Sequence, residues 1–596
     1  MANQQPKIHC LPGLPAPAAA LLLGISLLVC FLYLYPGPAA ISITSPDLTM
    51  KQSYLQGLYL LHGISGQDFI SYAMPLGPLL AAIASYCPET SNSFFWICFL
   101  LAIATQGFAI GSALGSRKTG TLSALLLLLA ANLSWTKITD MPPLEKAAMM
   151  LSTSLVFIAL LLRSRSRTLQ QEFLLALAIG INFMLKSPLF LLPPLLAAFD
   201  IISGKIRRGE TSWRNIALLC ILPYAMLLPW AYMNCALHGE LILFEKGRAG
   251  QNIISGALGI VRTIEGAYSL AGVSRHDSEI LWMIRTVAAH PLIYAEAVSL
   301  RIWTAFTWYP FLAVCLPLVY LRFIKDGRFQ AGALFFSYYV LIHCAMSIEY
   351  NYFTPIWPAA VASAGVLPYI FNTHPPQPQP GDRYPRLIFL ALLIPFCAAY
   401  LFVCALALGY PHRARPLTDA LSASSQGQTN ANPLLLAELA SEEIKSGDNS
   451  AAYDHAKQAV LKKPSPITMS AYLSALAMKK INLEQPVRRL LTKERNNATN
   501  RLEYEFLLLT NYLQLGKKRD AEQQFAAVFY AWTYSLHLSV TTDREQYLYS
   551  RLQTPYNNEF REIVLMTWMG RFPHDTQERF RRLLPELNDL IPGNAP

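Results

Sequence analysis

Charged side chains are scarce in this chain of 596 residues: only 14% of its residues are Asp, Glu, Lys or Arg, whereas 53% are hydrophobic. This balance lies outside the usual range of soluble globular domains. The few charges are also unevenly spread, because 43 of the 85 lie in residues 411–596. The sequence therefore predicts a membrane-embedded block, residues 1–410, followed by a soluble domain.

Cysteine and signal-peptide features are equally sparse. The ten cysteines lie mostly in or beside apolar runs and none follows Cys404, so a disulfide scaffold is not expected. The segment before the first apolar run has a single Lys, and Pro36-Gly37-Pro38 after that run is typical of a helix stop, so we expect no cleaved signal peptide. The net charge of +11 is largely explained by the Lys and Arg residues of loops on one side of the membrane. Nothing in the sequence favours nucleic-acid binding.

Apolar runs of the length that crosses a bilayer, about 20 residues, recur along the first 410 residues. We place them at 18–35, 92–115, 121–136, 144–162, 172–187, 189–201, 213–234, 304–323, 330–347, 354–371 and 387–409. The runs 172–187 and 189–201 are short and separated only by Lys186-Ser187-Pro188, so they form either two tilted helices or one broken helix. The expected fold is all-α, with about 11 membrane helices.

The orientation in the membrane follows from Lys and Arg in the connecting segments. With a cytoplasmic N-terminus, the inner segments contain Lys7, Arg117, Lys118, Arg163, Arg165, Arg167, Lys205, Arg207, Arg208, Arg214, Arg322, Lys325, Arg328, Arg383 and Arg386. The opposite loops contain few, with Lys51 and Lys137 as the clear exceptions. This asymmetry predicts that loops 36–91 and 236–303 and everything after residue 410 lie on the outer side. Short loops and an outer helical domain are typical of a bacterial inner-membrane protein with a periplasmic C-terminal domain.

The first outer loop has one carboxylate, Asp47, in residues 42–63, followed by a rough apolar helical face over residues 48–61. The next apolar stretch is interrupted by Pro75, Gly77 and Pro78. A full crossing there would move every later loop to the wrong side. We therefore expect it to lie in the membrane interface or to dip in and return.

Several motifs occur here in the order seen in one family. They are Asp47, Asp68-Phe69, Met74-Pro75-Leu76, Asp140 in "WTKITDMPPLEKA", Lys186-Ser187-Pro188 after a Gly-containing helix, "PWAYMNCALHGE" and "YNYFTPIWPAAVASAG". In this order and spacing, residues 15–371 resemble the GT-C superfamily of polytopic glycosyltransferases. That superfamily includes protein O-mannosyltransferases and the bacterial lipid A aminoarabinose and galacturonosyl transferases. The chain differs from the family pattern at Leu48, Met74 and Asn351.

The resemblance implies an inverting transfer of sugar from a polyprenyl-phosphate donor to a glycan, lipid or protein acceptor. The candidate catalytic carboxylates are Asp47 and Asp140, because a carboxylate is suited to act as general base toward an acceptor hydroxyl. Cations stabilise a departing phosphate. The candidate substrate-binding residues are Lys186, Lys246, Arg248, Arg301, Asp68 and Tyr352.

Each candidate also has a structural interpretation. Asp47 suits the N-cap of the helix that begins near Met50, and Lys186 suits a cation that reaches from an apolar span to the head groups. Asp140 suits the start of the next helix, and Lys246 and Arg248 suit ordinary loop charges. His276-Asp277 offers too few ligands for a metal. A divalent metal is compatible with the chemistry, although no residue pattern requires one.

Beyond residue 410 the sequence changes character. A Ser, Gln and Asn-rich linker, 411–433, precedes a helical domain, 434–596. Three segments of that domain align on Gly447, Asn482 and Gly516, at spacings of 35 and 34 residues. This period resembles tetratricopeptide repeats, which bind protein or polymer segments in a concave groove. The alternative is a plain helical domain that only packs on the outer face.

The sequence thus predicts a membrane glycosyltransferase, and two other functions stay open. One is a catalytically inactive scaffold of the same fold, with the repeats recruiting partners to a glycan-assembly complex. The other is a transporter of lipid-linked sugars, which polytopic helices with intramembrane prolines also suit. The halves of the chain show no inverted repeat, and this counts against the transporter.

Overall fold

The structure is a computed structural model. It describes residues 51–66, 71–87, 91–134, 143–245, 248–261, 268, 271–273, 278–372, 376–377, 383–422, 431–479, 508 and 512. Every regular element in these ranges is helical. The one extended pairing among them is a parallel bridge between Ile64 and Arg415. The all-α prediction is confirmed for the described part of the chain.

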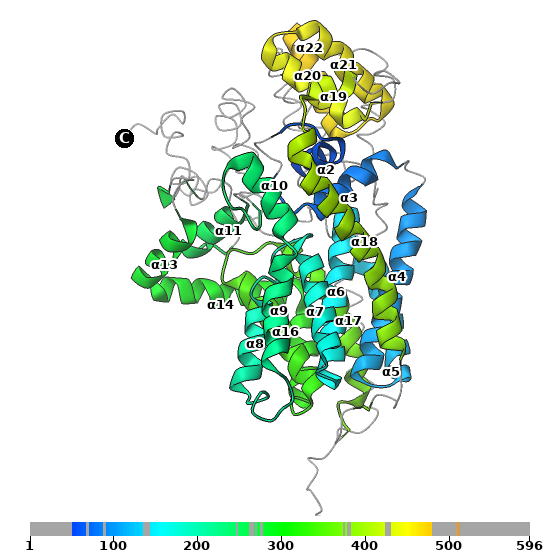
Figure 1. Cartoon of the computed structure of the whole chain (residues 1–596), viewed down its shortest axis with the longest axis vertical. Helices are drawn as coiled ribbons and strands as arrows, with labels where there is room; N and C mark the ends of the chain where they lie inside the picture. Colours follow the sequence, from blue (N-terminus) through cyan, green and yellow to red (C-terminus); the bar gives the residue numbers. More distant parts are fainter. Residues whose placement is uncertain are drawn as a thin grey trace, which may run out of the picture.

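The long helices run side by side along the long axis of the molecule as one bundle (Figure 1). Its first half consists of α4 (Ser91–Leu114), α5 (Arg117–Ser134), α6 (Pro143–Arg165), α7 (Leu169–Phe183), α8 (Leu192–Ile202), α9 (Trp213–Ala225) and α10 (Leu228–His238). Its second half consists of α15 (Pro310–Arg322), α16 (Gly327–Cys344), α17 (Trp357–Ser363) and α18 (Tyr384–Arg413). The most apolar window of α6 is 89% buried and that of α18 only 17%. Helix α6 is therefore the centre of the bundle, whereas α18 faces outward.

Four helical segments of the described part are long and apolar enough to cross a membrane. They are Phe94–Leu114, Leu144–Arg165, Trp213–His238 and Tyr384–Arg413. The predicted run 304–323 is divided at Tyr309 between α14 (Pro291–Trp308) and α15. The run 354–371 is divided among the 3-10 helix η3 (Tyr350–Ile356), α17 and the 3-10 helix η4 (Ala364–Tyr369). Prolines stand at these divisions and remove backbone donors from a continuous helix. The total of 11 spans stays a prediction, and its first member, 18–35, lies outside the described residues.

The short runs on either side of Lys186 form two separate helices that run in opposite directions. Glu172, in the first turn of α7, accepts hydrogen bonds at 2.8 and 2.9 Å from Arg163 Nε. Asp200, near the end of α8, also accepts from Arg163. The start of α7 and the end of α8 therefore lie together, with the connecting turn at the other end. Of the two alternatives left by the sequence, the structure has the pair of helices.

Arginines from connecting segments far apart in the sequence gather at one end of the bundle, which we call the arginine-rich end (Arg163, Arg165, Arg167, Arg322 and Arg328). Arg165 Nη2 donates to the carbonyl of Ala113 at 2.8 Å, and Arg328 Nη1 donates to that of Leu114 at 2.9 Å. Arg322 donates in the same way to the carbonyls of Ile370 and Asn372. Cations at helix carboxyl ends are favourable because the last carbonyls there lack helical partners. These five of the residues that set the predicted orientation thus share one end of the bundle.

At the opposite end, α2 (Lys51–His62) packs on α3 (Leu76–Tyr86). The contact is close, because a Cβ added to Gly57 would collide with the carbonyl oxygen of Pro78. Gln56 fixes the loop between them, donating to the carbonyl of Ala73 at 2.7 Å and accepting from its N–H. At about 1.5 Å per residue, the 11 residues of α3 span roughly half of a bilayer core. Helix α3 is therefore too short to cross, in agreement with the expected dip or interfacial position.

The described part of the C-terminal domain is a set of three packed helices, α20 (Pro433–Ser446), α21 (Asn449–Lys462) and α22 (Pro466–Lys479). Gly447 ends α20 at φ 86°, a left-handed conformation that glycine adopts readily. Asp448 then caps α21 by accepting from the N–H of Ala451. The helical turn expected at the first repeat is thus present. The aligned positions Asn482 and Gly516 lie outside the described residues, and the repeat class stays a prediction.

This helical set contacts α2 and α3 directly. Lys51 Nζ lies 2.8 Å from Glu438 Oε2 of α20. Ser85 accepts hydrogen bonds from Asn432 Nδ2 and from Lys463 Nζ, both at 3.0 Å. Part of the expected linker also forms the short helix α19 (Leu417–Ser422). The C-terminal helices lie on the end of the bundle opposite the arginine-rich end (Figure 1).

Candidate functional site

Three of the predicted site residues are described in full: Lys186, Arg301 and Tyr352. Arg248 is the first residue of α11 (Arg248–Ala257). Asp47, Asp68, Asp140 and Lys246 lie outside the described residues. Lys186 lies at the end of the bundle opposite the arginine-rich end, and its surroundings form the candidate site.

Lys186 belongs to the tight turn that joins α7 to α8. Its backbone N–H donates to the carbonyl of Asn182 at 3.0 Å. The hydroxyl of Tyr338, on α16, donates to the carbonyl of Pro188 at 2.6 Å and accepts from the N–H of Leu191 at 3.1 Å. Ser187 Oγ donates to Glu245 Oε1 at 3.3 Å. The turn is thus held at several points, so the backbone beneath Lys186 is rigidly placed.

The Lys186 ammonium lies over an aromatic ring, with Nζ 4.9 Å from the centroid of Tyr352. Such a cation–π contact contributes about 0.5–2 kcal/mol, depending on how far the cation is desolvated. The Tyr352 hydroxyl in turn donates to Asn252 Oδ1 of α11 at 3.0 Å. Two residues predicted separately, one from the Lys-Ser-Pro element and one from the late aromatic element, are therefore in contact.

His343 lies behind this pair and was not predicted. Its ring packs at tilted and edge-on angles against those of Tyr339, Tyr352 and Phe353, with centroid separations of 4.9, 5.1 and 5.7 Å. It is buried, and neither ring nitrogen has a hydrogen-bond partner among the described residues. Buried polar groups are usually paired. The sequence signal was a lone histidine near the end of an apolar run, "SYYVLIHC".

Arg301 occupies a different environment from the one expected of a residue that binds phosphate. It is fully buried. Its Nη2 donates to the carbonyls of Gly256 and Ile260 at 2.7 and 3.0 Å, and its Nη1 donates to that of Cys344 at 3.1 Å. Burial lowers the pKa of Arg301, but an arginine starts from so high a value that it stays charged. In this structure Arg301 joins the ends of α11 and α16.

A buried carboxylate that was not predicted lies at the start of α6. Glu145 and the adjacent Lys146 are both buried. Glu145 Oε2 accepts from Ser53 Oγ of α2 at 3.4 Å, and a Cβ on Gly77 of α3 would lie 2.8 Å from Glu145 Cδ. Glu145 thus lies where α2, α3 and α6 meet. The sequence signal was an acid in the first turn of an otherwise apolar helix, five residues after Asp140.

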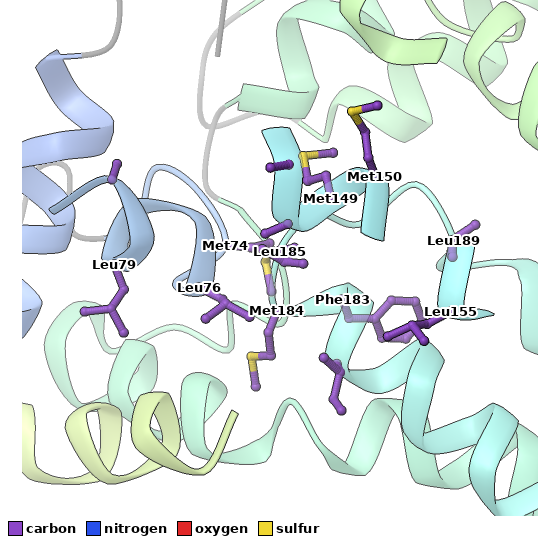
Figure 2. Close-up of a cluster of buried hydrophobic side chains, with 14 of the residues drawn as sticks. Met74, Leu76, Leu79, Met149, Met150, Leu155, Phe183, Met184, Leu185 and Leu189 are labelled. Carbon is purple, nitrogen blue, oxygen red and sulfur yellow. The ribbon is translucent and has the colours of Figure 1, made fainter. Parts of the chain in front are cut away.

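The Met-Pro-Leu element of the first outer loop lies beside the Lys-Ser-Pro element. The N–H of Leu76 donates to the carbonyl of Met184 at 2.9 Å. Figure 2 shows Met74 and Leu76 close to Met184 and Leu185, in a buried apolar cluster. Lys186 is half-buried beside this apolar cluster, so its charge is screened less than in bulk water.

Comparison of the chain with protein families, with curated proteins and with solved structures finds no match. Within the described ranges, no group of three or more His, Cys, Asp or Glu side chains is arranged to hold a metal ion. What the arrangement offers chemically is a cation on a rigid turn, an aromatic ring beneath it and a buried histidine behind it.

Proposed function

We propose that this chain is a membrane glycosyltransferase that transfers a sugar from a polyprenyl-phosphate donor to a glycan, lipid or protein acceptor. The observation that carries the proposal is the meeting of three segments at one end of the bundle. Leu76 is hydrogen-bonded to Met184, and Lys186 lies over Tyr352. These segments were selected for their order in the sequence, and their contact in space is an independent observation. We propose that the active site lies at that end of the bundle.

Lys186 has the role of binding the donor phosphate. An ammonium near the end of an apolar helix can meet a lipid phosphate at the membrane surface at less cost than at the bilayer centre. The Tyr352 ring beneath the ammonium helps to hold the cation at this position. The tightly held turn limits the entropy lost when the phosphate binds.

The carboxylate of Asp47 has the role of general base, with Asp140 as the second candidate. It accepts the proton of an acceptor hydroxyl as the hydroxyl oxygen attacks the anomeric carbon. The bond between that carbon and the phosphate oxygen breaks, and the polyprenyl phosphate leaves with the electron pair. The product has the opposite anomeric configuration. Lys186 stabilises the charge that builds on the phosphate.

The proposed site faces the periplasm of a bacterial inner membrane, with the arginine-rich end in the cytoplasm, as the positive-inside rule requires. The C-terminal helices lie at the same end as the site and contact α2 and α3. We propose that they receive an acceptor or a protein partner. Their role in the reaction is part of the proposal.

The test is transfer by the purified full-length chain in lipid nanodiscs, with polyprenyl-phosphate sugars as donors. We expect release of polyprenyl phosphate in the presence of an acceptor extract, and a release roughly 100- to 10,000-fold slower in the Asp47→Asn variant. Donor binding without any turnover would favour the inactive scaffold. Movement of the donor across the bilayer without cleavage would favour the transporter, and either result would refute the glycosyltransferase.

A further inference from the structure

Two consecutive helices of the long outer loop leave the bundle sideways. Helix α13 (Glu279–Ala289) and helix α14 (Pro291–Trp308) lie across the long axis of the molecule, whereas the bundle helices follow it (Figure 1). Residues 279–303 were predicted as part of an outer loop, and residues 304–308 as the start of a membrane span. Their direction suits elements that lie in the plane of a membrane rather than across it.

One face of each helix is fixed to the protein. On α14, Ala297, Arg301 and Ala305 are buried, four residues apart and therefore on one side of the helix. The hydroxyl of Tyr294 also donates to the carbonyl of Ala345 at 2.7 Å. On α13, Trp282 packs against a small apolar cluster that includes Ile254 of α11. The positions of both helices are therefore set by protein contacts.

The outward-facing side of each helix is exposed and mostly apolar. The large apolar residues on it are Ile280, Leu281 and Ile284 of α13 and Leu292, Ile293, Leu300 and Trp303 of α14. Leu292 is 84% exposed and Trp303 67%. Large exposed apolar patches are rare on soluble surfaces and mark sites of interaction with a partner or a membrane. Something apolar must cover this face in the native environment.

We propose that α13 and α14 lie at the membrane–water interface on the outer side of the membrane that the bundle spans. Their exposed apolar residues are inserted among the lipids. The chain has helices of membrane-spanning length, and α14 continues directly into α15, whose Leu318 and Leu321 are also exposed. The apolar face is thus continuous with a lipid-facing surface of the bundle. A helix with one apolar face and polar flanks binds such an interface.

The charged residues of α13 and α14 limit how deeply the two helices insert into the membrane. Arg285 of α13 and Glu296 of α14 are exposed, and Glu296 lies on the apolar face itself. A charge in the hydrocarbon core is costly, whereas at the head groups it is tolerated. Trp303 is of the kind that gathers at this level. The helices therefore lie at the head-group boundary and do not enter the core.

The position of α14 affects the candidate site around Lys186 and Tyr352. The protein-facing side of α14 carries Arg301, which holds the carbonyls of Gly256 on α11 and Cys344 on α16. Asn252 of α11 holds Tyr352. Anchoring α14 in the interface therefore fixes the height of Tyr352 relative to the lipid head groups. The inference itself does not depend on the proposed glycosyltransferase activity.

The experiment uses the full-length chain in nanodiscs that contain a phospholipid with a photoreactive diazirine near the glycerol. Hydroxyl-radical footprinting is run in parallel. Leu461 of α21, 52% exposed and on the C-terminal helices, is the control position. We expect Leu292 and Trp303 to be protected from oxidation and to carry lipid adducts, while Leu461 is oxidised and carries none.

The Ile284→Asp/Leu292→Asp double variant should lose lipid adducts over residues 279–303 by about tenfold, while Leu461→Asp leaves them unchanged. The wild-type footprint keeps the test decisive if the double variant fails to fold. Oxidation of Leu292 as fast as that of Leu461 would overturn the proposal. Protection without lipid adducts would also overturn it, because a second copy or another part of this chain would then cover the face.

Discussion

The ammonium of Lys186 lies 4.9 Å from the ring centroid of Tyr352, although the two residues come from distant parts of the sequence. The pair joins the turn between α7 and α8 to the 3-10 helix η3, and Asn252 of α11 holds the tyrosine hydroxyl. Three connecting segments thus converge on one cation. Lys186 and the proposed general base, Asp47, are therefore the residues to test first.

Replacing Lys186 with Ala should weaken donor binding by about 1.5–3 kcal/mol, the range for hydrogen bonds to charged groups. That corresponds to roughly a tenfold to a hundredfold rise in Kd. Binding of a fluorescent polyprenyl-phosphate sugar in nanodiscs measures it. Lys325→Ala, an exposed lysine at the arginine-rich end, is the matched control. Equal affinity in the two variants would show that Lys186 only reaches toward the head groups.

The Asp47→Asn variant separates capping from catalysis. Asn caps helices about as well as Asp, but its amide cannot accept the proton. We expect a folded protein that binds the donor normally and transfers the sugar roughly 100- to 10,000-fold more slowly, the usual contribution of a positioned base. Single-turnover transfer, with donor binding as the folding control, is the measurement. Wild-type transfer rates would move the role of base to Asp140, to be tested by Asp140→Asn.

The buried histidine yields a stability prediction. Both ring nitrogens of His343 are without a hydrogen-bond partner in the part of the chain that the structure describes, so His343→Leu removes buried polar groups and breaks no described bond. We expect unchanged thermal stability, or a gain of about 1 kcal/mol, because an unsatisfied buried group is costly. Phe353→Leu, which removes a ring from the same aromatic cluster, is the comparison and should lower Tm. A large fall in Tm for His343→Leu would mean that the imidazole is hydrogen-bonded in the folded protein.

The buried ion pairs at the arginine-rich end should be sensitive to loss of one charge. Asp200 faces Arg163, Arg167 at 2.7 Å and Lys205 at 3.3 Å. Asp200→Asn leaves these cations short of a counter-charge and should destabilise the fold by about 3–5 kcal/mol. Glu210→Gln, which breaks an exposed pair with Arg208, should cost less than about 1 kcal/mol. Thermal unfolding in the same detergent compares them, and similar Tm values would contradict the burial of the cluster.

Removal of residues 423–596 tests the role of the C-terminal helices. Their described contacts with the bundle are few, among them Lys51 with Glu438 and Ser85 with Asn432 and Lys463. We expect the truncated chain to bind and hydrolyse the donor but to transfer less sugar to its natural acceptor. Loss of donor binding in a truncated chain that unfolds at the wild-type temperature would make these helices part of the donor site.

Much of the fold could be predicted from apolar run lengths alone. The runs 92–115, 144–162 and 387–409 correspond to α4, α6 and α18, because long apolar segments can satisfy their backbone only as helices in an apolar medium. The placement of arginines at one end followed from loop charge. The turn at Gly447 followed from a glycine between two amphipathic segments, since a left-handed residue ends a helix there.

Other features depended on contacts that the pattern does not contain. The sequence by itself placed Lys186 at the end of an apolar run, but only the tertiary structure decided that Tyr352 lies beneath it. Arg301 is an ordinary loop cation until the ends of α11 and α16 bring their carbonyls to its guanidinium. The apolar face of α13 has the same period as a core helix. Burial in protein and exposure to lipid select the same side chains, so periodicity cannot tell them apart, and only the packing of neighbouring helices does.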